Sequence, residues 1–95
     1  MTTKQRAYLK GLAMNIEPTY RIGKSSLTPE FCEGIREVLE ARELVKVSVL
    51  NNCADDPKEL AKTLSERTGS EVVQVIGKKI VLYRESKTKK TIILP

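Results

Sequence analysis

Residues 19–50 read TYRIGKSSLTPEFCEGIREVLEARELVKVSVL, and this stretch decides the fold. Residues 44–50 alternate apolar and polar side chains and are rich in valine, which is typical of a strand with a buried face. Residues 19–22 predict a second, short strand. Between them, Thr28-Pro29-Glu30 predicts a helix start, with Thr28 as the cap and an acid in the first turn. Two strands that flank a crossover helix lie parallel, with a right-handed connection.

The crossover helix has an apolar stripe and a charged side. The stripe consists of Phe31, Ile35, Val38 and Leu39. The charged side consists of Glu33, Arg36, Glu37 and Glu40. Because this side leans acidic, we expect it to face water or a protein, and not phosphate.

Another helix is predicted at the start of the chain. Either Thr2 or Thr3 caps it, and Glu17-Pro18 ends it, since the residue before a proline avoids the α region. Apolar residues recur at helical spacing and predict one buried face. This face consists of Leu9, Leu12, Ala13 and Ile16.

The second half of the chain predicts a third helix and a hairpin. Asp55 or Asp56 caps the helix before Pro57, and Gly69 ends it. Its inward residues are Leu60, Ala61 and Leu64. Residues 71–76 and 79–84 predict two strands, and a connection of only two residues requires them to be antiparallel. The prediction is an α/β fold in the order αβαβαββ, with a mixed four-stranded sheet packed with helices.

The length of 95 residues suits one compact domain. We expect this domain to cover residues 1–85 and to be monomeric. Residues 86–95 are predicted to form a basic tail, mobile over its polar part. The apolar run at residues 91–95 either adds a short edge strand or packs on another surface.

The net charge of +5 is unevenly distributed. Residues 1–29 carry +4, residues 30–71 carry −4, and residues 72–95 carry +5. Segregated positive charge attracts a polyanion, because each neutralised phosphate releases condensed counterions. Nucleic acid is therefore the leading candidate partner, although surface lysines and arginines also serve solubility alone.

Several classes of function are disfavoured. No apolar run approaches the roughly 20 residues of a membrane span, and no secretory signal precedes Lys10. The chain has no histidine, and Cys32 and Cys53 lack the close spacing of a metal or redox site. We expect no enzymatic activity, cofactor, metal, small-molecule substrate or membrane partner, and a reducing cytoplasm as the location.

The loop Gly23-Lys24-Ser25-Ser26 is the leading candidate site. It lies between a strand and a capped helix, where backbone N–H groups and the helix dipole favour an anion. Lys24 adds a charge, Gly23 can adopt positive φ, and Ser25 and Ser26 offer hydroxyl groups. The Walker and dinucleotide-binding spacings are absent. Such loops often serve only to reverse the chain, so the loop alone is weak support for phosphodiester binding.

Other basic residues are predicted to widen the phosphate contact. They are Lys4, Arg6, Lys10, Arg21, Lys78, Lys79 and Arg84. The last three join the loop only if the hairpin lies near the first strand, and Arg84 pairs equally well with an acid such as Glu71 or Glu85. Base stacking is considered for Tyr20 above Tyr8 and Tyr83, but packing explains each of them better.

Three motifs together resemble the CRM family (chloroplast RNA splicing and ribosome maturation), especially its bacterial stand-alone members. They are Lys4-Gln5-Arg6-Ala7-Tyr8-Leu9, Ile22-Gly23-Lys24-Ser25-Ser26-Leu27-Thr28 and Gly77-Lys78-Lys79-Ile80-Val81-Leu82-Tyr83-Arg84. The resemblance implies a fold similar to the C-terminal domain of translation initiation factor 3. It also implies binding to large-subunit ribosomal RNA or its precursor, in ribosome assembly or maturation.

The family loop resembles Gly-Lys-x-Gly, analogous to the loop by which KH domains hold a nucleic-acid backbone. Ser26 stands here in place of the second glycine. This departure puts close approach of the RNA backbone at position 26 in doubt.

A different class of function is a protein-interaction module. In that case the acidic middle segment would dock on ribosomal or other basic proteins, and the basic ends would contribute little. Phosphate contacts make RNA binding strongly salt-dependent, so salt dependence distinguishes the two functions.

Overall fold

The computed structural model describes residues 1–95 and confirms the predicted order of elements. The elements are α1 (Thr3–Ala13), β1 (Tyr20–Ile22), α2 (Pro29–Arg42), β2 (Leu44–Val49), α3 (Pro57–Thr68), β3 (Glu71–Ile76) and β4 (Lys79–Tyr83). The helix caps follow from local chemistry. Thr2 and Gln5 form a reciprocal capping box at α1, while the Thr28 and Asp56 side chains each accept an N–H at the start of α2 and α3.

The four strands form one mixed sheet in the order β1-β2-β4-β3. β1 is parallel to β2 and β4 is antiparallel to β3, as predicted, and β4 is also antiparallel to β2. The second strand of the hairpin therefore occupies the middle of the sheet. As a result β2 lies between the hairpin and β1. Lys78 and Lys79 are therefore on the other side of β2 from the loop at residues 23–26.

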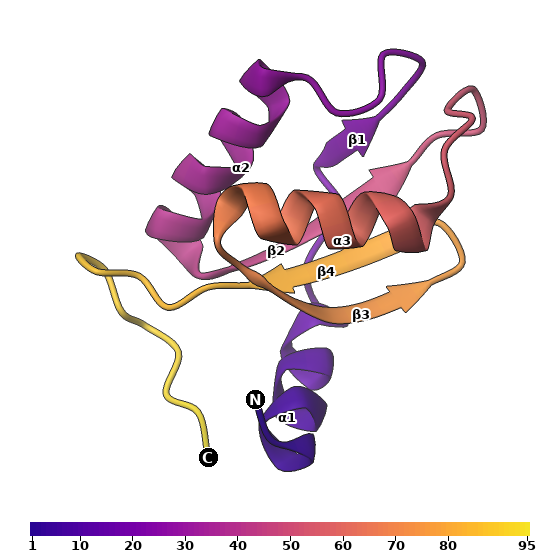
Figure 1. Cartoon of the computed structure of the whole chain (residues 1–95). Helices are drawn as coiled ribbons and strands as arrows, with labels where there is room; N and C mark the ends of the chain where they lie inside the picture. The colour runs from indigo at the N-terminus through magenta and orange to yellow at the C-terminus, as the bar shows by residue number, and fades with distance from the viewer.

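Different helices cover the two faces of the sheet (Figure 1), and each face buries one apolar cluster. α2 and α3 cover one face, where the larger cluster includes Ile35, Leu39 and Leu64. α1 covers part of the other face, through Leu9 and Ala13. α1 packs over the end of the sheet that contains Leu44, Val73, Val81 and Tyr83. The opposite end of this face is left uncovered by a helix.

A buried carboxylate holds the C-terminal segment against the end of α2. Glu43 follows α2 with a φ of 68° and is fully buried. It accepts hydrogen bonds from the backbone N–H groups of Ser86 (2.7 Å), Thr91 (2.7 Å) and Ile92 (2.8 Å). Burial opposes ionisation of Glu43, but these hydrogen bonds outweigh burial and lower its pKa.

A second carboxylate, Glu40, fixes the same segment one turn earlier. It accepts the Thr88 hydroxyl (2.6 Å) and the backbone N–H groups of Thr88 (3.0 Å) and Lys87 (3.2 Å). The Thr88 hydroxyl is the main cause that lowers the pKa of Glu40 to about 2; partial burial opposes it, and the bonds from Lys87, Ser86 and the Thr88 N–H add to it. These contacts differ from the mobile arm expected for this segment.

The apolar end of the chain packs and does not form a strand. No strand is assigned to residues 86–95. Ile92 and Leu94 pack against the α1 cluster, and the Gln5 side-chain amide donates to the Pro95 carbonyl (3.2 Å). The two ends of the chain therefore lie side by side (Figure 1). Of the two alternatives for residues 91–95, the structure shows packing.

Candidate nucleic-acid interface

The predicted loop, residues 23–26, is a tight turn between β1 and α2. The backbone N–H of Ser26 donates to the Gly23 carbonyl (3.0 Å). Lys24 and Ser25 at the tip are exposed, and Lys24 forms no ion pair or side-chain hydrogen bond. The turn therefore presents an unpaired ammonium group directly before the capped start of α2.

Ser26 carries the unusual backbone of this loop. Its φ is 55°, in the left-handed region that favours glycine, whereas Gly23 does not have a positive φ. A Cβ added at Gly23 would be in ordinary contact, 3.5 Å from Asn52 Oδ1 and 3.6 Å from Leu50 Cδ1. The conformational freedom that Gly23 offers is therefore not used in this loop. The strained position is the one where the resembled family places its second glycine.

Two other connections lie beside the loop at the same end of the sheet (Figure 1). The Leu50 N–H donates to the Ile22 carbonyl (2.9 Å), so the connection after β2 adjoins the loop after β1. The Val49 N–H donates to the Lys78 carbonyl (2.7 Å), and Lys78 Nζ donates to Asn51 Oδ1 (2.8 Å). The hairpin turn is therefore joined to the loop region through β2.

A row of side chains crosses the sheet just inside this end. The strand register aligns Arg21 with Ser48 and Ser48 with Lys79. Tyr20 and Ile22 pack on the α2 and α3 side, as does Ile80, so the alternating Arg21 and Lys79 point to the opposite face. Lys79 Nζ donates to Ser48 Oγ (3.3 Å).

Four cations thus gather at one end of the sheet. We call them the basic edge: Arg21, Lys24, Lys78 and Lys79. All four are exposed, and none forms an ion pair. They come from two segments more than 50 residues apart, β1 with its loop and the hairpin, which the sheet brings to the same end.

Arg6, one of the predicted contact residues, holds two parts of the fold together. Arg6 donates to the carbonyls of Val72 (2.5 Å) and Val73 (3.0 Å), beside the irregular pairing of β3 with β4. It ties α1 to an edge strand and offers little to a ligand. The sequence could not indicate this, because the carbonyl partners lie 66 and 67 residues away.

Arg84 lies at the far end of β4 from Lys79 and does not join the basic edge. It donates to the carbonyls of Thr68 (2.9 Å), at the end of α3, and Arg36 (3.2 Å), in the middle of α2. It also pairs with Glu40 at 3.5 Å, and not with Glu71 or Glu85. Lys4 and Lys10 are exposed on α1, and no hydrogen bond or ion pair joins either to the basic edge.

The opposite side of the loop is acidic. The Ser26 hydroxyl is hydrogen-bonded to the Asp55 carboxylate, which fixes the loop against the connection before α3. A groove of about 430 Å³ lies there, and its lining includes Asp55, Asp56 and Glu59. A polyanion is repelled on this side, so its favourable approach is over the open face of the sheet.

The tyrosines offer little to bases near the loop. Tyr20, the preferred stacking candidate, is partly buried against the larger cluster, and Tyr83 is buried in the α1 cluster. Tyr8 is more exposed, at 43%, but it lies on α1. The structure thus favours phosphate contact over base stacking at the basic edge.

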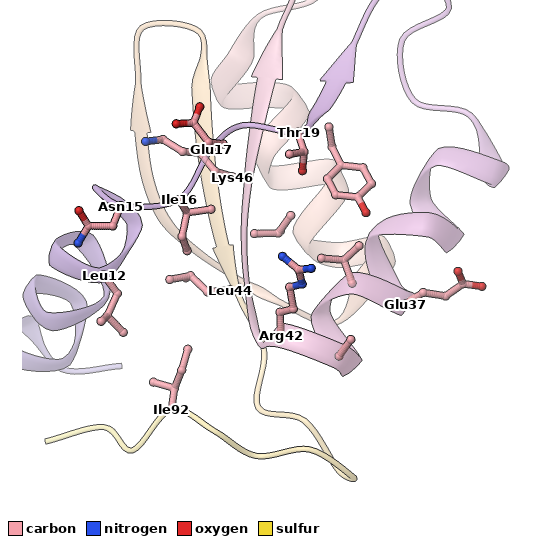
Figure 2. Close-up of a pocket in the computed structure, with 14 residues that line it drawn as sticks. Leu12, Asn15, Ile16, Glu17, Thr19, Glu37, Arg42, Leu44, Lys46 and Ile92 are labelled. Atoms are coloured by element: carbon pink, nitrogen blue, oxygen red, sulfur yellow. The ribbon is translucent and has the colours of Figure 1, made fainter.

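An apolar groove of about 880 Å³ lies away from the basic edge (Figure 2). Leu12 and Ile16 approach it from the α1 side, Leu44 from β2, and Ile92 from the C-terminal segment. None of the predicted contact residues lines it. The groove is mainly apolar, and it does not belong to the candidate interface.

The cysteines, the possible metal ligands and the helix lengths concern redox, metal-binding and membrane functions. Cys32 and Cys53 are both free and buried. No group of three or more His, Cys, Asp or Glu side chains is placed to hold a metal ion. None of the helices has both the length and the apolar character needed to cross a membrane.

Sequence reasoning missed two asparagines of this region. Asn51 and Asn52 end β2 in the sequence, but in the structure Asn51 holds Lys78 and Asn52 lies beside Gly23. The available signal was their position after a strand parallel to β1. Ends of parallel strands meet at the same edge of a sheet.

Comparison with known proteins agrees with this architecture. The chain is 44% identical over 95 residues to "Probable RNA-binding protein YqeI" of Bacillus subtilis, covering 100% of this chain and 99% of that one. It is 33% identical over 90 residues to an RNA-binding protein of Haemophilus influenzae, covering 95% and 91% of the two chains. The solution structure of the hypothetical protein SAV1595 from Staphylococcus aureus matches with a TM-score of 0.83 and 56% identity, over 100% and 99% of the two chains.

The names of these relatives describe binding and no reaction, in agreement with the prediction of a non-enzymatic domain. Residues 1–84 match the CRS1/YhbY (CRM) domain. The match contains the whole sheet, the three helices and every residue of the basic edge. The family resemblance of the three sequence motifs is therefore confirmed, and the chain belongs to the CRS1/YhbY (CRM) domain family.

Proposed function

We propose that this protein binds structured RNA by placing the phosphate backbone against the basic edge. The observation that carries the proposal is the convergence of Arg21 and Lys24 with Lys78 and Lys79 from two distant segments, with no acid paired to any of them. Arg21 and Lys24 have no side-chain partner to lose when a phosphate binds, and Lys78 and Lys79 each lose at most one hydrogen bond to a neutral group. Each contact then adds affinity through counterion release.

The loop contributes shape as well as charge. The N–H groups before α2 and the positive end of its dipole favour a phosphate beside Lys24 and the exposed Ser25. Ser26 shapes the turn, since its hydroxyl is occupied by Asp55. Gly23 leaves room beside Asn52 for a close approach.

The RNA is proposed to be large-subunit ribosomal RNA or its precursor, and the role to be ribosome assembly or maturation. This finer assignment rests on the family resemblance of the sequence motifs and on the names of the relatives, which state RNA binding. We further propose that the protein acts as a monomer in the cytoplasm. Its two buried free thiols suit a reducing compartment.

The proposal is tested by comparing Lys24→Glu with Lys62→Glu in binding to a structured RNA. Both lysines are exposed, but Lys62 lies on α3 away from the basic edge. We expect Lys24→Glu to weaken binding about tenfold or more, through the loss of one phosphate contact and the added repulsion, and Lys62→Glu to change it far less. Equal effects of the two variants would show that only net charge matters. RNA binding without salt dependence would instead favour docking through the acidic α2 surface.

A further inference from the structure

The C-terminal segment presents a second group of lysines, far from the basic edge. We call Lys87, Lys89 and Lys90 the tail lysines. β4 begins at Lys79 and ends at Tyr83, a rise of about 14 Å, and the tail starts beyond that far end. The loop after β1 and the tail therefore lie at opposite ends of the sheet (Figure 1).

The tail backbone is held, while its charges are left free. Glu43 and Glu40 accept the N–H groups of the segment, and neither acid forms an ion pair with a tail lysine. Lys87 and Lys89 are exposed and form no ion pair, and Lys90 alone pairs, with Glu85. Ser86 Oγ also accepts the Lys89 N–H (2.8 Å), which fixes the local turn.

The tail differs from a flexible segment whose charged side chains only interact with solvent. Holding a polar chain end in one conformation costs conformational entropy, and burial of the Glu43 carboxylate costs desolvation. Hydrogen bonds from the backbone N–H groups of the segment to the Glu40 and Glu43 carboxylates offset both costs. The result is an ordered basic turn with at least two free cations, which lowers the entropic cost of binding a polyanion.

We propose that the tail lysines form a second phosphate-binding surface, so that the protein contacts two separate segments of one structured RNA. The inference rests on the proposed RNA-binding function. The basic edge takes one segment and the tail takes the other, because the sheet holds the two surfaces apart. The protein then favours RNA folds that place two backbones at this separation.

The test uses Lys87→Gln/Lys89→Gln and the matched control Lys58→Gln/Lys62→Gln on α3. Each pair removes two charges from exposed lysines, and none of the four side chains forms an ion pair or hydrogen bond. Two RNA probes are compared: one with two helical arms, and one hairpin with a stem shorter than the separation of the surfaces. Circular dichroism and thermal unfolding verify that each variant is folded.

We expect the tail variant to bind the two-armed RNA about tenfold more weakly at low salt, with a log-log salt slope shallower by about 1.5. The short hairpin should bind the tail variant and the wild type equally. The inference is overturned if affinity for the two-armed RNA is unchanged, if the control loses as much, or if both RNAs weaken equally. Absence of salt-dependent binding by the wild type would instead refute the proposed function.

Discussion

Ser26 hydrogen-bonds to the Asp55 carboxylate through its hydroxyl while its backbone lies in the left-handed region, with a φ of 55°. The hydrogen bond and the backbone conformation act in opposite directions on stability. A non-glycine residue pays about 1 kcal/mol or more for this conformation, and the hydrogen bond to the neighbouring connection offsets part of that cost. The loop is therefore held in place by a contact that a glycine could not make.

Ser26→Gly should be more stable than Ser26→Ala by about 1 kcal/mol. Both variants lose the bond to Asp55, so that loss cancels in the comparison, and only alanine retains the left-handed penalty. Urea unfolding of the two variants measures the difference. Equal stabilities would mean that Ser26 is not held at positive φ in solution.

Gly23→Ala should change the free energy of unfolding by less than about 1 kcal/mol, because the added methyl group meets only ordinary contacts. Gly69→Ala is the matched comparison. Gly69 ends α3 with a φ of 68°, so its replacement should cost about 1 kcal/mol or more. The same urea experiment separates the two, and a larger loss at Gly23 than at Gly69 would contradict the loop geometry.

Arg84→Met should lower stability but not RNA affinity, whereas Arg21→Met should lower RNA affinity but not stability. Arg84 donates to two backbone carbonyls and pairs with Glu40, so its loss should lower stability by about 2 kcal/mol and leave RNA affinity of the folded protein unchanged. Arg21 forms no ion pair and should lose RNA affinity with little change in stability. Thermal unfolding and RNA titration of both variants are the two readouts. If the folded Arg84→Met variant bound RNA more weakly, Arg84 would belong to the RNA interface after all.

Stability should fall when the solution is acidified below about pH 4.5. The pKa of Glu40 is lowered from 4.5 to about 2, and the pKa of Glu43 is also lowered, so the folded state holds fewer protons than the unfolded state. Their contribution is complete above the unfolded pKa and is lost as the pH falls toward 2. Glu40→Gln should flatten this dependence, measured as the free energy of unfolding against pH. An unchanged profile would show that Glu40 does not hold the tail.

Local signals predicted most of the fold. Thr28-Pro29 and Asp56-Pro57 begin helices as their chemistry requires, and the short Gly77-Lys78 connection sets the hairpin. The exposed position of Lys24 in the loop before α2 likewise follows from the local sequence. These features depend on neighbours only a few positions away, which is why sequence patterns reveal them.

The features that the sequence did not predict depend on contacts between residues far apart in the chain. Arg6 and Arg84 look like any other basic residue in sequence, yet their carbonyl partners come from distant segments. Glu43 adopts a positive φ that a glutamate seldom takes, and its hydrogen bonds to the tail come from residues more than 40 positions away. The proximity of Lys78 to the first loop depends on the strand order, which the predicted element order leaves open.

The salt dependence of RNA binding tests the central claim most directly. The wild type is compared with Arg21→Gln/Lys24→Gln/Lys78→Gln/Lys79→Gln in binding to the short RNA hairpin over a range of salt concentrations. If the basic edge binds the phosphate backbone, the log-log slope of the variant should be shallower by about 3, since each neutralised phosphate contributes about 0.7 to 0.9. A folded variant that retains the wild-type affinity and slope would contradict the account.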